Sequence, residues 1–182
     1  IADYYYAIVL PKEEKDATSL TYVSLSLLII TTLLTAITII FSQPISMLFK
    51  SPDLAKYYWI MPLYVFVMGA WNILNYWYIR CARYDSVSAY QLSQSILSAG
   101  GKLGFGYAGQ LSGGMIYSTV LAPALSLLLS LLRSRKIIAN LATFSWTKTI
   151  ETARKYRNLP FYSLPRSFIN MLAGQLPVLL LT

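Results

Sequence analysis

The chain has 182 residues and a formal net charge of +8, and 56% of its residues are hydrophobic but only 12% are charged. The hydrophobic fraction and the mean hydropathy of +0.52 are higher than in ordinary soluble domains. They indicate an integral membrane protein. The single cysteine and the lack of histidine exclude an internal disulfide, a Cys/His metal site and a histidine general base.

The first predicted membrane span follows an abrupt change from charged to uncharged sequence. All five residues after Pro11 are charged, whereas the 33 residues from Ala17 to Phe49 include no Asp, Glu, Lys or Arg. About 20 helical residues are enough to cross the hydrocarbon core of a bilayer. We therefore expect a transmembrane helix over 20–41, preceded by a water-facing flank at 12–16.

Three further spans are predicted after the first. Residues 57–79 are uncharged and carry aromatic residues at both ends, where rings lie at the lipid headgroups. Residues 86–103 contain serines, glutamines and Lys102, so a helix here has to turn one face away from lipid. The glycine-rich stretch GFGYAG at 104–109 predicts a turn. Residues 110–132 are apolar again and end in a basic stop.

Two more elements are predicted near the end of the chain. Residues 144–160 place apolar and charged side chains on opposite faces of a helix, which is typical of a segment lying in the membrane interface. Residues 163–182 are apolar and predict a fifth span. Gly113 and Gly114, within the fourth span, predict close packing against another helix.

The basic residues predict how the chain is oriented in the membrane. Twelve of them lie on one side of the membrane, in the N-terminal flank and every second loop after it. Two lie in the loops of the other side, and Lys102, within a span, is counted with neither side. By the positive-inside rule, the first side is cytoplasmic and the first span runs outward. Because these charges fall between apolar spans and not on one solvated face, nucleic acid is not an expected partner.

Three stretches of sequence carry a family resemblance: AIVLPKEEKDA at 7–17, GFGYAG at 104–109 and KYRNLPFYSLPRSFINMLAGQLPVLLL at 155–181. They resemble the polysaccharide (O-antigen type) flippases, whose superfamily also contains the multidrug and toxic compound extrusion transporters. The third stretch is the most specific. Its residues that match the family pattern are Tyr156, Arg157, Pro160, Ser163, Leu164, Pro165, Gln175 and Pro177.

One departure from the family pattern precedes the first of these stretches. The family usually has a basic residue, a tyrosine and an acid there, whereas this chain has Asp3 followed by three tyrosines. The reversed charge argues against giving this loop a role in binding a lipid headgroup.

The resemblance implies an all-α, polytopic bundle of transmembrane helices that is part of a twelve-to-fourteen-span exporter fold. Residues 1–143 would correspond to spans three to six of the first helix bundle. Residues 144–160 would form a cytoplasmic linker helix, and residues 161–182 would begin span seven in the second bundle. The expected location is the bacterial plasma (inner) membrane.

The resemblance also implies a function. The protein would flip polyprenyl-diphosphate-linked oligosaccharide from the cytoplasmic to the outer leaflet for the synthesis of a surface polysaccharide, without a cofactor. Its expected partners are this substrate and membrane lipid, with H⁺ or Na⁺ as a coupling ion and a polysaccharide polymerase as further candidates. Drug export by the same superfamily is the alternative. A membrane-embedded enzyme is not expected, because the acidic residues lie in flanks and form no catalytic pair within a span.

Within this function, Lys102 is the first candidate for binding substrate. A lysine in a span is costly unless it faces protein, water or an anion, so it could contact the diphosphate, or it could extend to the outer headgroups. Arg166 could meet a phosphate entering from the cytoplasm, or it could be an ordinary positive-inside anchor. The amides could bind sugar hydroxyls or a neighbouring helix. These amide candidates are Gln91, Gln94, Asn170 and Gln175.

Overall fold

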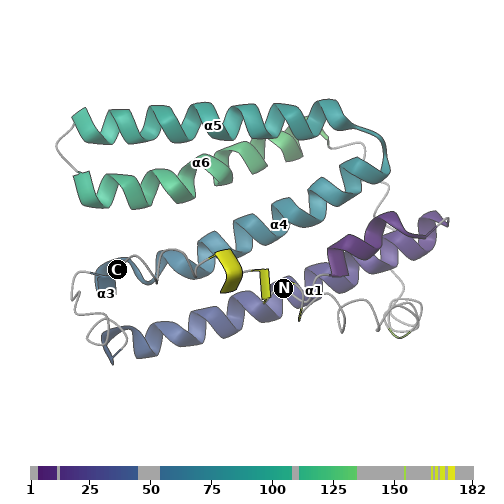
Figure 1. Ribbon diagram of the computed structural model, residues 1–182, viewed down its shortest axis with the longest axis horizontal. Helices are drawn as coiled ribbons and strands as arrows, with labels where there is room; N and C mark the ends of the chain where they lie inside the picture. The colour runs from purple at the N-terminus through teal and green to yellow at the C-terminus, as the bar shows by residue number, and fades with distance from the viewer. Residues whose placement is uncertain are drawn as a thin grey trace.

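The computed structural model describes residues 4–11, 13–44, 54–107 and 111–134, together with 154, 165, 167, 169, 170 and 172–174. Across residues 4–134, every element in the described ranges is a helix (Figure 1). The elements are η1 (Tyr4–Val9), α1 (Glu14–Ile37), η2 (Thr38–Phe41), α3 (Leu54–Tyr57), α4 (Ile60–Arg80), α5 (Tyr84–Tyr107) and α6 (Leu111–Arg133). The all-α prediction is therefore confirmed for the described part of the chain.

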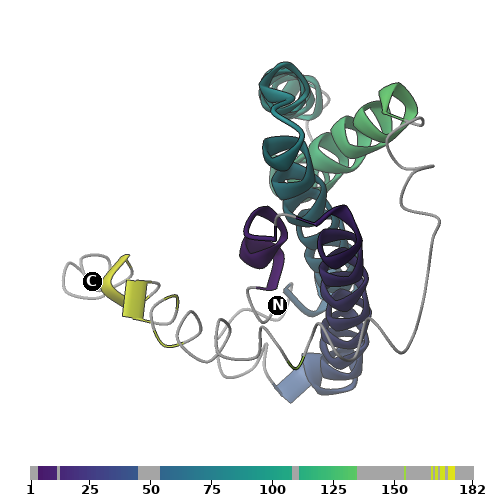
Figure 2. The same cartoon turned by 90° about the vertical axis from the view of Figure 1, so that its right-hand side faces the viewer.

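The helices form layers with α4 in the middle. Helices α5 and α6 lie side by side as an antiparallel hairpin, and α4 packs between this hairpin and α1 (Figures 1 and 2). One core cluster joins η1, α1 and α4 around Leu20, Ile73 and Trp77. A second joins α4, α5 and α6 around Tyr78, Tyr90 and Leu127. Helix α4 thus contributes to both cores and positions the other helices.

Helix α1 is apolar yet carries many serines and threonines, whose hydroxyls form hydrogen bonds with the helix backbone. A set of serines and threonines donates to the carbonyl oxygen four residues earlier, at 2.7 to 3.0 Å. These residues are Thr18, Ser19, Thr21, Ser24, Ser26, Thr31, Thr32 and Thr35. Because the hydroxyls are satisfied within the helix, they can lie in hydrocarbon at little cost.

Two described helices are long and apolar enough to cross a membrane, namely residues Glu14–Pro44 and Gly113–Arg133. The first of them contains the predicted span at 20–41, and the second covers residues 113–132 of the fourth predicted span. Helices α4 and α5, with 21 and 24 residues, overlap the segments predicted as the second and third spans. By length alone they could also cross a membrane, and their spanning stays a prediction. Their aromatic and polar residues, including Trp71, Asn75 and Gln91, make them less uniformly apolar.

The turn predicted at 104–109 is wrong for its first four residues, which continue helix α5 to Tyr107. Glycine in a helix costs about 1 kcal/mol relative to alanine, but packing against α6 offsets that cost here. Phe105 lies directly against Gly114, where even an added Cβ would meet the Phe105 side chain. The same contact confirms the close packing predicted at Gly114.

The predicted linker helix at 144–160 and the fifth span at 163–182 lie almost wholly outside the described residues. Within them, Arg154 and the described residues from Pro165 to Gly174 are helical. The proposed division of the chain into spans of two bundles therefore stays a prediction.

Candidate functional site

Polar side chains follow one face of helix α5. Gln91, Ser95, Ser98 and Lys102 recur at spacings of three and four residues, which places them along one side of a helix. Gln91, Ser95 and Lys102 are exposed, and Ser98 is half-buried. Gln94 borders this set and is also half-buried. We call these five residues the polar face of α5.

The polar face lies beside the side of α5 that packs on the rest of the molecule. Tyr90 stacks on Trp71 of α4 with ring centroids 3.3 Å apart. Gly101 approaches α6 so closely that a Cβ there would lie 3.0 Å from the Cβ of Ser118. Leucine and isoleucine side chains such as Leu92 and Leu103 are exposed elsewhere on α5. Helix α5 therefore presents a packed side, an apolar side and a polar side.

Lys102 lies toward the end of α5 that the positive-inside rule assigns to the outer face. It is 16 residues from Ser86, which is about 24 Å along a helix, and it makes no ion pair with any residue in the described ranges. An ammonium group there can donate to phosphate oxygens as a point charge. The amides and hydroxyls along the same face can exchange hydrogen bonds with sugar hydroxyls.

Half of the candidate binding residues identified from the sequence are thus brought together. Gln91, Gln94 and Lys102 share the polar face of α5. Asn170 is helical and exposed but belongs to another segment, so its position adds nothing to this face. Arg166 and Gln175 lie outside the described residues.

Where α4 and α6 both end, Tyr78 links the two helices. The Tyr78 side chain is fully buried. Its hydroxyl lies 2.7 Å from Ser134 Oγ and 2.9 Å from Ser130 Oγ, and it also donates to the Ser130 carbonyl at 3.3 Å. These hydrogen bonds fix the position of α4 along the axis of α6.

Arg80, one of the loop charges counted for orientation, binds backbone carbonyls. Its Nη1 donates to the carbonyl oxygens of Ile8 and Pro11, and its Nη2 donates to that of Glu13 at 3.3 Å. Ile8, Pro11 and Glu13 are therefore held against α4, with Ile8 completely buried. This geometry gives the AIVLP stretch a structural role.

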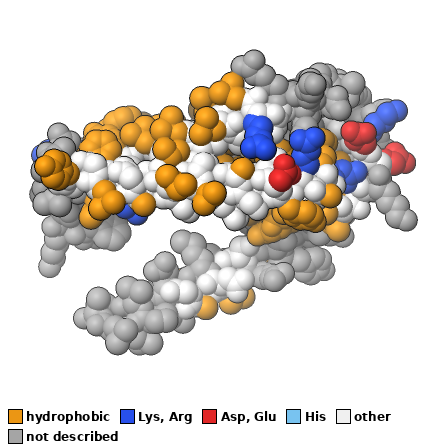
Figure 3. Space-filling model, turned by 90° about the horizontal axis from the view of Figure 1, so that it is seen from above, with side chains coloured by type: hydrophobic (Ala, Val, Ile, Leu, Met, Phe, Trp, Pro, Cys, Tyr) orange, Lys and Arg blue, Asp and Glu red, His pale blue; other side chains and the backbone are white. Residues whose placement is uncertain are grey.

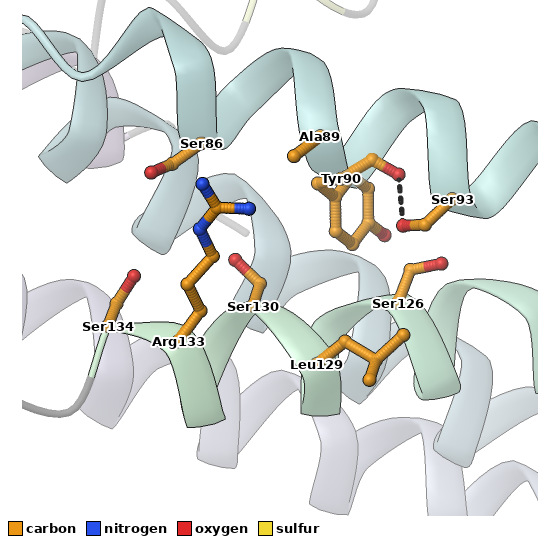
Figure 4. Close-up of a pocket in the computed structure, with 9 residues that line it drawn as sticks. All are labelled: Ser86, Ala89, Tyr90, Ser93, Ser126, Leu129, Ser130, Arg133 and Ser134. Atoms are coloured by element: carbon orange, nitrogen blue, oxygen red, sulfur yellow. Dashed lines mark hydrogen bonds between the residues drawn. The ribbon is translucent and has the colours of Figure 1, made fainter.

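A hydroxyl-rich cavity of about 180 Å³ lies between the first half of α5 and the last half of α6 (Figure 4). It is lined by Ser86, Ala89, Tyr90, Ser93, Ser126, Leu129, Ser130, Arg133 and Ser134. This cavity was not predicted from the sequence. The available signal was the recurrence of serine every four residues at 126, 130 and 134, which places three hydroxyls on one face of a helix.

Charged side chains gather at this same end of the molecule, whereas the rest of the visible face is mostly apolar or uncharged (Figure 3). Such a distribution is typical of a helix bundle with one end in water and its middle section in lipid. Within the part of the chain that the structure describes, no group of acidic, cysteine or histidine side chains could hold a metal ion.

Comparison with known proteins identifies one family. The sequence profile of a family described as "polysaccharide biosynthesis protein" matches residues 6–181, nearly the whole chain. Searches of curated proteins and of solved structures returned no match.

Proposed function

The chain belongs to the polysaccharide biosynthesis protein family, and from this premise we propose that it flips a polyprenyl-diphosphate-linked oligosaccharide across the bacterial plasma membrane. A role in polysaccharide biosynthesis follows from the family. The proposed step moves the headgroup from the cytoplasmic to the outer leaflet. It answers a physical need, because a glycan and a diphosphate cannot cross about 30 Å of hydrocarbon unaided.

The polar face of α5 is the observation that carries this proposal. Helix α5 packs on the apolar helix α6 and exposes Gln91, Ser95 and Lys102 along one side. Such a side is costly against lipid. It is suited to line a wet path shared with helices outside the described residues. In this path Lys102 would contact the diphosphate, and the amides would contact sugar hydroxyls.

The remaining parts of the proposal come from the resemblance. The described helices α1, α4, α5 and α6 would be spans three to six of a multi-pass transporter, and Arg166, Asn170 and Gln175 would line the second bundle's side of the path. Alternating access between the two bundles would deliver the headgroup outside. The protein would act as a transporter with no enzymatic step, driven by H⁺ or Na⁺.

The proposal is tested by the sidedness of the lipid-linked oligosaccharide in vesicles, read with a lectin that reaches only one face. We expect Lys102→Gln in the full-length protein to slow the appearance of outward-facing glycan by at least about tenfold, since a charged hydrogen bond contributes roughly 1.5 to 3 kcal/mol. Leu103→Ala is the matched control, because Leu103 is the exposed neighbour on the apolar side of α5.

Two results would contradict the proposal. Unchanged sidedness when the whole protein is deleted would exclude flipping and make drug export the leading function. Equal loss of flipping with Lys102→Gln and Leu103→Ala would mean that the polar face is not the path.

A further inference from the structure

The cavity between α5 and α6 contains two buried hydroxyl groups without a partner. Tyr90 and Ser126 are 2% and 0% exposed. Neither Tyr90 Oη nor Ser126 Oγ has a hydrogen-bond partner among the described residues, and both residues line the cavity. Because an unsatisfied buried polar group is costly, these hydroxyls indicate that the cavity takes a polar occupant.

The charge around the cavity favours an anion. The Arg133 side chain extends from α6 toward α5, and its guanidinium lies among Ser86, Ser130 and Ser134 (Figure 4). Helix α5 begins beside the cavity, so the positive end of its dipole also faces this region. Two nearby groups would repel an anion. The carboxylate of Asp85 is exposed and does not line the cavity. The negative end of the α6 dipole is offset by Arg133 in the last turn of that helix.

The position of the cavity favours a lipid over a solute. Leu129 lines the cavity and is 54% exposed. On α6 it is followed and preceded by other exposed leucines, including Leu125, Leu128 and Leu132. The cavity therefore lies where the apolar surface of α6 meets the charged end of the molecule. A headgroup could enter the cavity while its acyl chains stay against these leucines.

We propose that the cavity binds the phosphate group of an anionic phospholipid from the cytoplasmic leaflet. Arg133 donates to the phosphate oxygens. The hydroxyls of Tyr90 and Ser126, with Ser86, donate the remaining hydrogen bonds. This site is distinct from the proposed path at Lys102, about 24 Å away along α5, and it does not depend on what the protein transports.

The test measures binding of short-chain phosphatidic acid to the full-length protein in mild detergent, from the rise in melting temperature with lipid concentration. We expect the apparent Kd to weaken at least about tenfold in Arg133→Gln. We expect it to weaken several-fold in Tyr90→Phe, which keeps the ring stacked on Trp71, and in Ser126→Ala. Phosphatidylcholine of the same chain length should stabilise the protein much less.

Two matched controls separate this site from general effects. Arg83→Gln removes an exposed charge at the same end of the molecule but outside the cavity. Ser118→Ala removes a buried serine of α6 whose hydroxyl donates to the Met115 carbonyl. Both should bind phosphatidic acid as the unmodified protein does.

Three outcomes would overturn the proposal. Equal weakening by Arg83→Gln would indicate nonspecific attraction to a basic surface. Equal stabilisation by inorganic phosphate would assign the cavity to a soluble anion. No stabilisation by any of these probes would leave the cavity filled by water.

Discussion

At the scale of single residues, Arg80 shows how a loop charge can act inside the fold. Its guanidinium binds three backbone carbonyls of the segment that precedes α1. We expect Arg80→Met, which keeps the aliphatic length and removes the donors, to destabilise the protein by roughly 2 kcal/mol, because charged hydrogen bonds are lost and carbonyls are left unpaired. The measurement is the midpoint of unfolding in detergent. Arg83→Met is the control at the exposed neighbouring arginine, and an equal shift in both variants would refute the role of Arg80.

Ala82 offers a second prediction at this scale. It has a φ of 52°, in the left-handed region, directly after α4. Ala82 N donates to the Ile79 carbonyl at 3.0 Å, and Arg83 N donates to the Tyr78 carbonyl at 2.8 Å. This pattern is a Schellman motif, in which glycine is preferred. Ala82→Gly should therefore stabilise the protein by about 1 kcal/mol, and a lower unfolding midpoint in this variant would refute the assignment.

At the scale of elements, the contact between α5 and α6 depends on small residues. A Cβ at Gly114 would collide with the Cβ of Phe105, whereas a Cβ at Gly104 would meet nothing within 4 Å. We expect Gly114→Ala to destabilise the hairpin by about 1 to 3 kcal/mol through overpacking. The matched variant Gly104→Ala should be neutral or stabilising by up to about 1 kcal/mol. Unfolding midpoints compare the two, and a neutral Gly114→Ala would mean that the helices do not pack this closely.

At the scale of the whole molecule, the orientation in the membrane can be read from Cys81, which is exposed in the turn between α4 and α5. A membrane-impermeant maleimide should label it only from the cytoplasmic face. Burial raises the pKa of the Cys81 thiol above its ordinary value of 9.0, although Arg80 acts in the opposite direction. Because the thiolate is the reacting form, labelling should accelerate as the pH rises and should still be increasing above pH 9.

Two variants control this topology experiment. Cys81→Ser should abolish the cytoplasmic signal. Tyr107→Cys in that background, at the exposed far end of α5, should be labelled only from outside. Labelling of both positions from the same face would contradict the arrangement in which α5 spans the membrane.

The helical class and the four long helices α1, α4, α5 and α6 could be predicted from the sequence, because hydropathy and charge are local properties of the chain. Residues 17–41 of the uncharged run form most of α1 and all of η2, and the basic stop after Leu132 coincides with the end of α6. The polar face of α5 could also be predicted, since a spacing of three and four residues places Gln91 and Lys102 on one side of any helix.

What only the tertiary structure decided are the contacts between residues far apart in the chain. GFGY was predicted to be a turn, but it is helical, and Phe105 within it packs against Gly114 of α6. Arg80 was counted as a loop charge, although the carbonyls it binds come from the segment before α1. The cavity of Tyr90, Ser126 and Arg133 was not predicted, because a hydroxyl's partners depend on how α5 meets α6. Composition and periodicity determine which helices form and which sides are polar, whereas only packing determines which polar groups face each other.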